Sequence, residues 1–227
     1  MNKFLKYSSV LILTMLSSVA YSQEYDDDAQ LWLNLNLEKK LNDQFDVHFS
    51  HSSRISNNFS QYGLGYGDIG VSYARNKNIK VSLDYVLREK LNPDGSYSTR
   101  HRAYLAVLLK KEIKQFTFSF RYRLQTELKD VLTSEDGMVP KYYDRYKGSI
   151  KYELNKRYAV YVSEELYYPW YQAKNKGFDR SRSALGLIYK ISKKKSLEGN
   201  FTYRHELNAF KATHRDFIYS LTYSYEF

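Results

Sequence analysis

The chain has 227 residues, with 35 Lys and Arg against 25 Asp and Glu, a formal net charge of +10, and no cysteine. The lack of cysteine excludes a disulfide framework and a thiolate metal site, and the positive charge is too evenly spread to indicate a nucleic-acid surface. After residue 22 no apolar run approaches the roughly 20 residues of a membrane-spanning helix, so a helical membrane protein is excluded.

Residues 1–22 have the three parts of a secretory signal peptide. Lys3 and Lys6 form a charged start, residues 10–16 are apolar, and residues 20–22 form a small-x-small cleavage site. Removal of the two lysines lowers the net charge from +10 to +8. We therefore expect an exported protein, and export also argues against nucleic acid as a partner.

Residues 23–227 are expected to form one domain, because no Pro/Gly/Ser-rich linker divides them. The whole chain has 24 Tyr and 12 Phe but only 3 Pro, a composition that favours strands. Apolar and polar residues alternate in segment after segment, the pattern of strands with two different faces. In chain order, the clear segments are 31–38, 45–50, 79–88, 102–109, 116–127, 142–154, 158–166, 182–189 and 216–227.

The connections alternate between short and long, as periplasmic turns and external loops of a membrane barrel do. Short turns are expected at 42–43, 76–78, 111–114, 155–157 and 192–195, and longer stretches at 57–61, 92–98, 129–141, 172–179 and 206–214. The segments reach about ten residues, enough to cross a bilayer as tilted strands. We therefore predict an all-β fold, a single antiparallel transmembrane β-barrel of about 10 to 12 strands.

Eleven segments can be counted, but a bacterial barrel with both termini in the periplasm needs an even number of strands. This argument predicts ten or twelve. A glycine-rich stretch at 57–75 is the place where a further strand could lie. Glu164 is a second irregularity, because its parity puts a charge among apolar neighbours and suggests a bulge or a position near the membrane rim.

Aromatic residues gather near the segment ends, where a membrane barrel has rings at the lipid headgroups. We assign to this girdle Tyr62, Tyr97, Tyr142, Tyr167, Tyr168, Trp170, Tyr171, Tyr225 and Phe227. The rival fold is a soluble, lipocalin-like barrel whose apolar face points inward.

The final residues resemble the C-terminal signal that the barrel assembly machinery reads, with Tyr223, Tyr225 and Phe227 as its aromatic positions. The chain also resembles the family called domain of unknown function 2490, on Gln30-Leu31-Trp32-Leu33, residues 48–54 and Arg121-Tyr122-Arg123. This resemblance implies a barrel in the outer membrane of Gram-negative bacteria, mainly Bacteroidetes, with outer-membrane lipids and the assembly machinery as partners. It implies no specific activity.

On the barrel interpretation the polar faces point into the lumen. The charged residues expected there are Arg88, Arg102, Arg121, Arg123, Arg145, Lys147, Arg182, Arg204, Asp84, Glu127, Glu165 and Glu198. They could line a pore that attracts anions, or they could fill a narrow barrel with salt bridges. Because an eight-stranded barrel is already filled by its side chains, we favour filling over a dedicated anion pathway.

An enzyme would need a nucleophile, a base and a group that orients the base. His48 and Ser50 share a face, but the sequence identifies no orienting carboxylate. The scattered histidines form no metal motif, and Asp26, Asp27 and Asp28 are expected to be solvated or disordered. We therefore predict no catalytic, cofactor-binding or metal-binding residues.

The sequence thus leaves three functions open. We put first a porin-like passage or binding site for small, anionic solutes, with a lipid-modifying enzyme and a sealed structural or surface-interaction barrel as alternatives.

Overall fold

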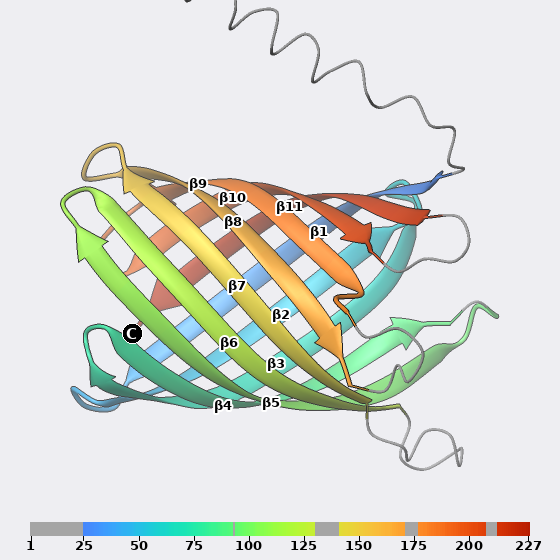
Figure 1. Cartoon of the computed structure of the whole chain (residues 1–227), viewed down its shortest axis with the longest axis horizontal. Coiled ribbons are helices and arrows are strands. Elements are labelled where there is room, and N and C mark those ends of the chain that lie inside the picture. The colour runs from blue at the N-terminus through green and yellow to red at the C-terminus, as the bar shows by residue number, and fades with distance from the viewer. Residues whose placement is uncertain (1–24, 93, 130–140, 171–176, 208–212) are drawn as a thin grey trace, which may run out of the picture.

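Strands that close into one barrel make up the described part of the chain (Figure 1). The computed structural model describes residues 25–92, 94–129, 141–170, 177–207 and 213–227, and these residues include no helix long and apolar enough to cross a membrane. The strands are β1 (Tyr25–Lys40), β2 (Phe45–Ser56), β3 (Gln61–Asn76), β4 (Ile79–Leu91), β5 (Tyr97–Ile113), β6 (Phe116–Lys129), β7 (Lys141–Glu153), β8 (Tyr158–Pro169), β9 (Arg180–Lys190), β10 (Lys195–Glu206) and β11 (Thr213–Glu226). The expected signal peptide and most of the expected loop at 129–141 lie outside the described residues.

Asparagine side chains form three of the short turns. The Oδ1 atoms of Asn42, Asn76 and Asn155 each accept hydrogen bonds from two backbone N–H groups, two and three residues further on, at 2.8 to 3.0 Å. An Asn that bonds to its own turn in this way reverses the chain within a few residues. The local sequence therefore fixes where these strand pairs reverse direction.

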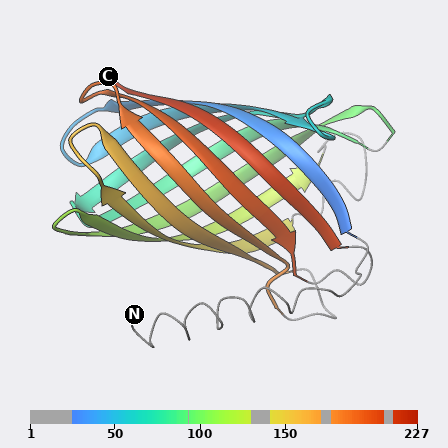
Figure 2. The same ribbon diagram turned by 90° about the horizontal axis from the view of Figure 1, so that it is seen from above.

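An odd number of strands closes the barrel. Sequence neighbours pair antiparallel, and β1 pairs with β11 in parallel, from Tyr25↔Thr213 to Glu38↔Glu226. The count of eleven is confirmed, with β3 in the glycine-rich stretch, and the argument for an even number is wrong. With an odd count the first and last strands run in the same direction. β1 therefore begins at the barrel end that carries the long connections, and β11 finishes at the barrel end that carries the short turns (Figure 2).

The outer face is apolar. Large exposed hydrophobic side chains recur on every strand, for example Ile69, Leu83, Val162 and Leu185, each more than half exposed. The buried set is mainly polar and includes Asp46, Asp68, Asp84, Gln125, Arg145, Glu165 and Asp216. This inside-out distribution is that of a membrane barrel and the reverse of the lipocalin-like alternative.

The sequence placed Tyr167 on the wrong face and Glu164 on the correct one. Tyr167, assigned to the girdle, is 5% exposed and lines the lumen. Glu164 points outward without any bulge, because the register of β8 with β7 and β9 is continuous, and its Oε2 accepts a hydrogen bond from Ser183 at 2.5 Å. Other girdle residues do pair at the loop end, where the Tyr142 and Trp170 rings are 5.9 Å apart. Tyr171 lies outside the described residues.

Candidate functional site

The lumen contains two cavities that meet inside the barrel. The loop-end cavity, of about 660 Å³, is lined at its outer limit by Ser56, Gly63 and Lys141. The turn-end cavity, of about 790 Å³, extends to the β9–β10 turn and Glu226. Asn36, Ser50, Tyr104, Arg121 and Arg123 line both. The two cavities therefore adjoin inside the barrel, and these five residues form the boundary between them, which we call the junction.

Cationic side chains dominate the loop-end cavity. Its lining includes thirteen Lys and Arg residues but only four Asp and Glu residues. The cations are Arg54, Arg88, Lys90, Arg100, Arg102, Arg121, Arg123, Lys141, Arg145, Lys147, Arg180, Arg182 and Arg204, and the acids are Asp68, Glu127, Glu165 and Glu198. A low-dielectric wall with this imbalance focuses a positive potential inside the lumen.

Two of the carboxylates each sit among three arginines. In the first group, the Glu127 cluster, Glu127 accepts hydrogen bonds from Arg88 at 2.7 Å and from the Nε atom of Arg102 at 3.0 Å, and Arg100 is 3.6 Å away. The three guanidinium groups come from β4 and β5, and the carboxylate comes from β6. One negative charge therefore faces three positive ones.

The second group, the Glu165 cluster, repeats this arrangement on β6 to β9. Arg121 donates to Glu165 at 2.6 Å, Arg145 donates to both carboxylate oxygens at 2.9 Å, and Arg182 is 4.0 Å away. Glu165 is only 5% exposed. Each cluster holds its arginines in fixed positions and keeps an excess of positive charge, as an anion-binding wall requires.

Two further arginines stack on aromatic rings. The guanidinium carbon of Arg54 lies 3.6 Å from the centre of the Trp32 ring, and that of Arg123 lies 3.7 Å from the centre of the Tyr104 ring. Among the described residues, no carboxylate lies within 4.0 Å of either guanidinium group. Their charges are held by rings rather than neutralised, so both remain available to an anion in the lumen.

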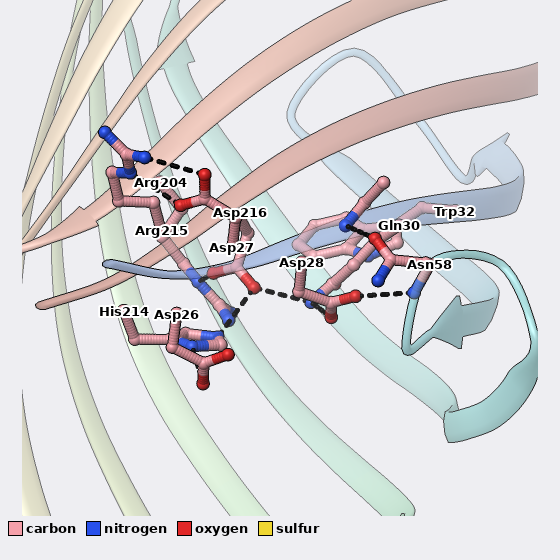
Figure 3. A network of polar contacts seen from close by, with 11 residues as sticks. Asp26, Asp27, Asp28, Gln30, Trp32, Asn58, Arg204, His214, Arg215 and Asp216 are labelled. Carbon is pink, nitrogen blue, oxygen red and sulfur yellow. Dashed lines mark hydrogen bonds and ion pairs between the residues drawn. The ribbon is translucent and has the colours of Figure 1, made fainter. Parts of the chain in front are cut away.

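A polar network joins β1 to β11 at the loop end of the barrel (Figure 3). Asp216, with no exposed surface, accepts hydrogen bonds from Arg204 and from Gln30, the latter at 2.7 Å. On the neighbouring residues, Arg215 donates to both oxygens of Asp27 at 2.6 and 2.7 Å. The Arg215–Asp27 ion pair and the Gln30–Asp216 hydrogen bond span the parallel seam where the chain closes on itself.

The acidic residues at the start of β1 are part of this network, so the expectation of disorder is wrong, whereas Asp26 and Asp27 are exposed to solvent as expected. Asp26 contacts His214 at 2.9 Å, and Asp28 accepts a hydrogen bond from the backbone N–H of Asn58 at 2.9 Å. Asn58 belongs to a run of three residues with positive φ, 57–59, that folds over the seam (Figure 3). The sequence did not reveal this role because the partners are about 30 and 190 residues away.

The His48 and Ser50 pair considered from the sequence does not form a catalytic arrangement. His48 instead bonds to Asp84 through Nε2 at 2.5 Å, and its Nδ1 atom is 3.4 Å from the Ser72 hydroxyl. Ser72 is 2% exposed, which leaves a substrate little access to its oxygen. The geometry therefore gives no support to nucleophilic catalysis at this histidine.

Every charged residue that the sequence analysis assigned to the lumen lines one of the two cavities. Asp84 lines the turn-end cavity, and the other eleven line the loop-end cavity, Arg121 and Arg123 being shared. Sequence reasoning missed Arg54, although it lies an even number of residues from His48 and so shares its face of the same strand. It also missed Asp68, because the neighbouring glycines hide the alternation of β3.

Comparisons with known proteins agree on the fold. A family model described as a protein of unknown function, DUF2490, matches residues 29–215, and no curated protein matches the chain. Among solved structures, a NanC porin is 14% identical with a TM-score of 0.52, over 88% of this chain and 99% of that one. A bacterial polysaccharide outer membrane secretin is 10% identical with a TM-score of 0.53, over 79% and 63%.

A third solved structure, an anion-selective porin from Comamonas acidovorans, is 14% identical with a TM-score of 0.41, over 80% of this chain and 53% of that one. This chain therefore spans about half the length of that porin and less than two thirds of the secretin. At these identities, the two matches with TM-scores above 0.5 show that the chain has the fold of outer-membrane barrels.

Proposed function

We propose that this chain, which belongs to the DUF2490 family of proteins of unknown function, is a porin-like barrel of the bacterial outer membrane that binds and passes small anionic solutes. The family supplies no activity, so the proposal rests on the barrel wall and its lumen. Export by residues 1–22 and recognition of Tyr223, Tyr225 and Phe227 by the assembly machinery belong to the same proposal.

The membrane location is supported by the outer surface. Closure pairs the backbone groups of every strand, which is what permits strands to cross a hydrocarbon layer. The strands have 11 to 17 residues, whereas about 9 to 11 tilted residues suffice to span a bilayer. The exposed Leu, Val, Ile and Phe side chains would cost free energy in water and are stable against lipid tails.

Passage is supported by the meeting of the two cavities, and this observation carries the proposal. A barrel packed solid with its own side chains would lack such cavities, whereas here the loop-end and turn-end cavities adjoin at Arg121 and Arg123. The expectation that salt bridges fill the narrow interior applies to Glu127 and Glu165, but the hollow lumen extends beyond both clusters.

The preference for anions is supported by the cations that lack carboxylate partners. Arg123 stands at the junction, stacked on Tyr104, so a solute that crosses the lumen passes close to its charge. A unit charge about 7 Å from an ion changes the energy of the ion by roughly 0.6 kcal/mol even in bulk water. This energy corresponds to about a threefold change in the occupancy of an anion.

The test is single-channel conductance of the refolded protein in a planar bilayer, with the reversal potential measured across a KCl gradient. We expect discrete steps and a reversal potential that indicates chloride over potassium. Arg123→Gln should lower the anion preference by about threefold or more. Arg157→Gln, which removes the same charge from the exposed β7–β8 turn, should leave it unchanged.

Silence from folded wild-type protein would reject passage and favour the sealed structural barrel. Equal selectivity of the Arg123→Gln variant and the wild type would reject the anion pathway, even if the barrel conducts.

A further inference from the structure

The wall of the lumen holds a second kind of charged cluster, in which carboxylates lack arginine partners. His48 on β2 and Asp84 on β4 both pair in register with Gly70 on β3 and meet above it, with 2.5 Å between Nε2 and Oδ1. Asp68 brings a carboxylate oxygen to the same place, so that ligand atoms from His48, Asp68 and Asp84 all lie within 4.8 Å of one another. We call these three residues the histidine–aspartate cluster.

Glycine at position 70 makes this meeting possible. A Cβ atom there would lie 2.4 Å from Asp84 Oδ1 and 2.5 Å from His48 Nε2, closer than real Cβ contacts come. Any other residue would push the imidazole and the carboxylate apart. The backbone of β3 therefore forms the floor of a small polar cradle built from three adjacent strands.

No cation contacts the Asp68 carboxylate directly in this cradle. It is 8% exposed, its Oδ2 atom accepts a hydrogen bond from Tyr104 at 2.6 Å, and its Oδ1 atom has no hydrogen-bond partner. Among the described residues, no Lys, Arg or His nitrogen lies within 4.0 Å of its carboxylate. A buried carboxylate without a countercharge costs free energy unless a cation joins it.

We propose that His48, Asp68 and Asp84 bind a divalent transition-metal ion of the zinc type. An imidazole nitrogen and two carboxylate oxygens are a ligand set that Zn²⁺ accepts at about 2.0 to 2.2 Å, with a fourth position left for water or solute. At that bond length two ligand atoms in tetrahedral geometry are about 3.4 Å apart. Entry of the ion would therefore widen the contact between His48 and Asp84 by about 1 Å.

Neighbouring hydroxyl groups hold the ligands in the orientation that a metal needs. Ser82 donates to Asp84 Oδ2 at 2.7 Å, as Tyr104 does to Asp68, so in each carboxylate the other oxygen is left for the ion. The Ser72 hydroxyl faces His48 Nδ1 at 3.4 Å and can accept a hydrogen bond from the Nδ1–H group, which leaves Nε2 as the ligand. Such outer partners fix the tautomer and direction of a metal-binding histidine.

The position of the cluster gives an ion access from the lumen and a place in the solute path. His48 and Asp84 line the turn-end cavity, Asp68 lines the loop-end cavity, and Tyr104 lines both. An ion held there would stand at the junction of the two and would offer its open position to an anionic solute.

The test is calorimetric titration of Zn²⁺ into the full-length, refolded and chelator-treated protein in detergent. We expect saturable binding of one ion by the histidine–aspartate cluster. Asp68→Asn should weaken it at least about tenfold, and His48→Gln should do the same, so the proposal stays testable if one variant fails to fold. Binding that is absent, or unchanged in both folded variants, would overturn the proposal.

His214 provides the matched control, because it also lies between two carboxylates, Asp26 at 2.9 Å and Asp216 at 3.0 Å. There Arg204 already neutralises Asp216, so His214→Gln should leave the affinity for Zn²⁺ unchanged. Loss of binding in His214→Gln with retention in His48→Gln would move the metal to the seam and refute the assignment.

This metal site does not depend on conduction. Zinc binding by a protein that stays silent in a bilayer would support the site and reject the porin-like function. Conduction without zinc binding would reject the metal site and support the porin-like function.

Discussion

The two halves of the lumen neutralise their buried carboxylates in different ways. Toward the loops, Glu127 and Glu165 each meet three guanidinium groups, whereas near the junction Asp84 bonds to the imidazole of His48, and Asp68 has no Lys, Arg or His nitrogen within 4.0 Å among the described residues. Position in the same barrel wall therefore does not decide the role of an acidic residue. Glu127 and Glu165 organise cations, whereas Asp68 has none in direct contact.

The largest expected effect comes from removing a carboxylate in the arginine-rich half. Glu165→Gln leaves the guanidinium groups of Arg121, Arg145 and Arg182 without their shared countercharge, and loss of one partner from such a buried group costs about 3 to 5 kcal/mol. The free energy of unfolding can be measured by urea titration, with tryptophan fluorescence as the signal.

Glu164→Gln is the matched control. Glu164 is adjacent to Glu165 but points to the lipid side, and among the described residues it bonds only to Ser183. Its stability should stay within about 0.5 kcal/mol of the wild type or rise. Equal losses in both variants would show that the three-arginine cluster has no special weight.

A smaller effect is expected from filling the floor of the histidine–aspartate cluster. Gly70→Ala should cost about 1 to 3 kcal/mol, because its methyl group collides with His48 and Asp84. Gly148→Ala is the control, because a Cβ atom at that position would have no neighbouring atom within 4 Å, and it should change stability by less than about 0.5 kcal/mol. The same urea titration checks both, and a neutral Gly70→Ala would contradict the close approach across β3.

The smallest effect, and one of opposite sign, is expected for the unpaired carboxylate. In chelator-treated buffer, Asp68→Asn should raise the free energy of unfolding by about 1 kcal/mol, because it removes a buried charge and keeps an acceptor for Tyr104. Urea titration of metal-free protein measures it. A loss above about 1 kcal/mol would show that Asp68 is neutralised in the folded barrel, and the contrast between the two halves would fail.

The sequence by itself determined the strands and the faces of most side chains. A strand places successive residues on opposite faces, so parity alone sent Arg88, Arg121 and Glu165 to the lumen and Leu185 to the lipid side. Where the alternation is broken by small residues, as around Asp68, the same reasoning gave no prediction. It also misplaced Tyr167, because an aromatic ring near a strand end suits either a headgroup or an arginine.

Only the tertiary structure decided how the barrel closes and which charges meet. The alternation of side chains along a strand cannot tell that β1 pairs with β11 in parallel. That pairing follows from closure of the barrel and not from any local pattern. Nor can it bring His48 to Asp84 or Arg204 to Asp216, because the contact depends on the register across neighbouring strands. The sequence determines which face of its strand each side chain occupies. The contacts between charged groups in the lumen depend on distances between strands, which only the closed barrel sets.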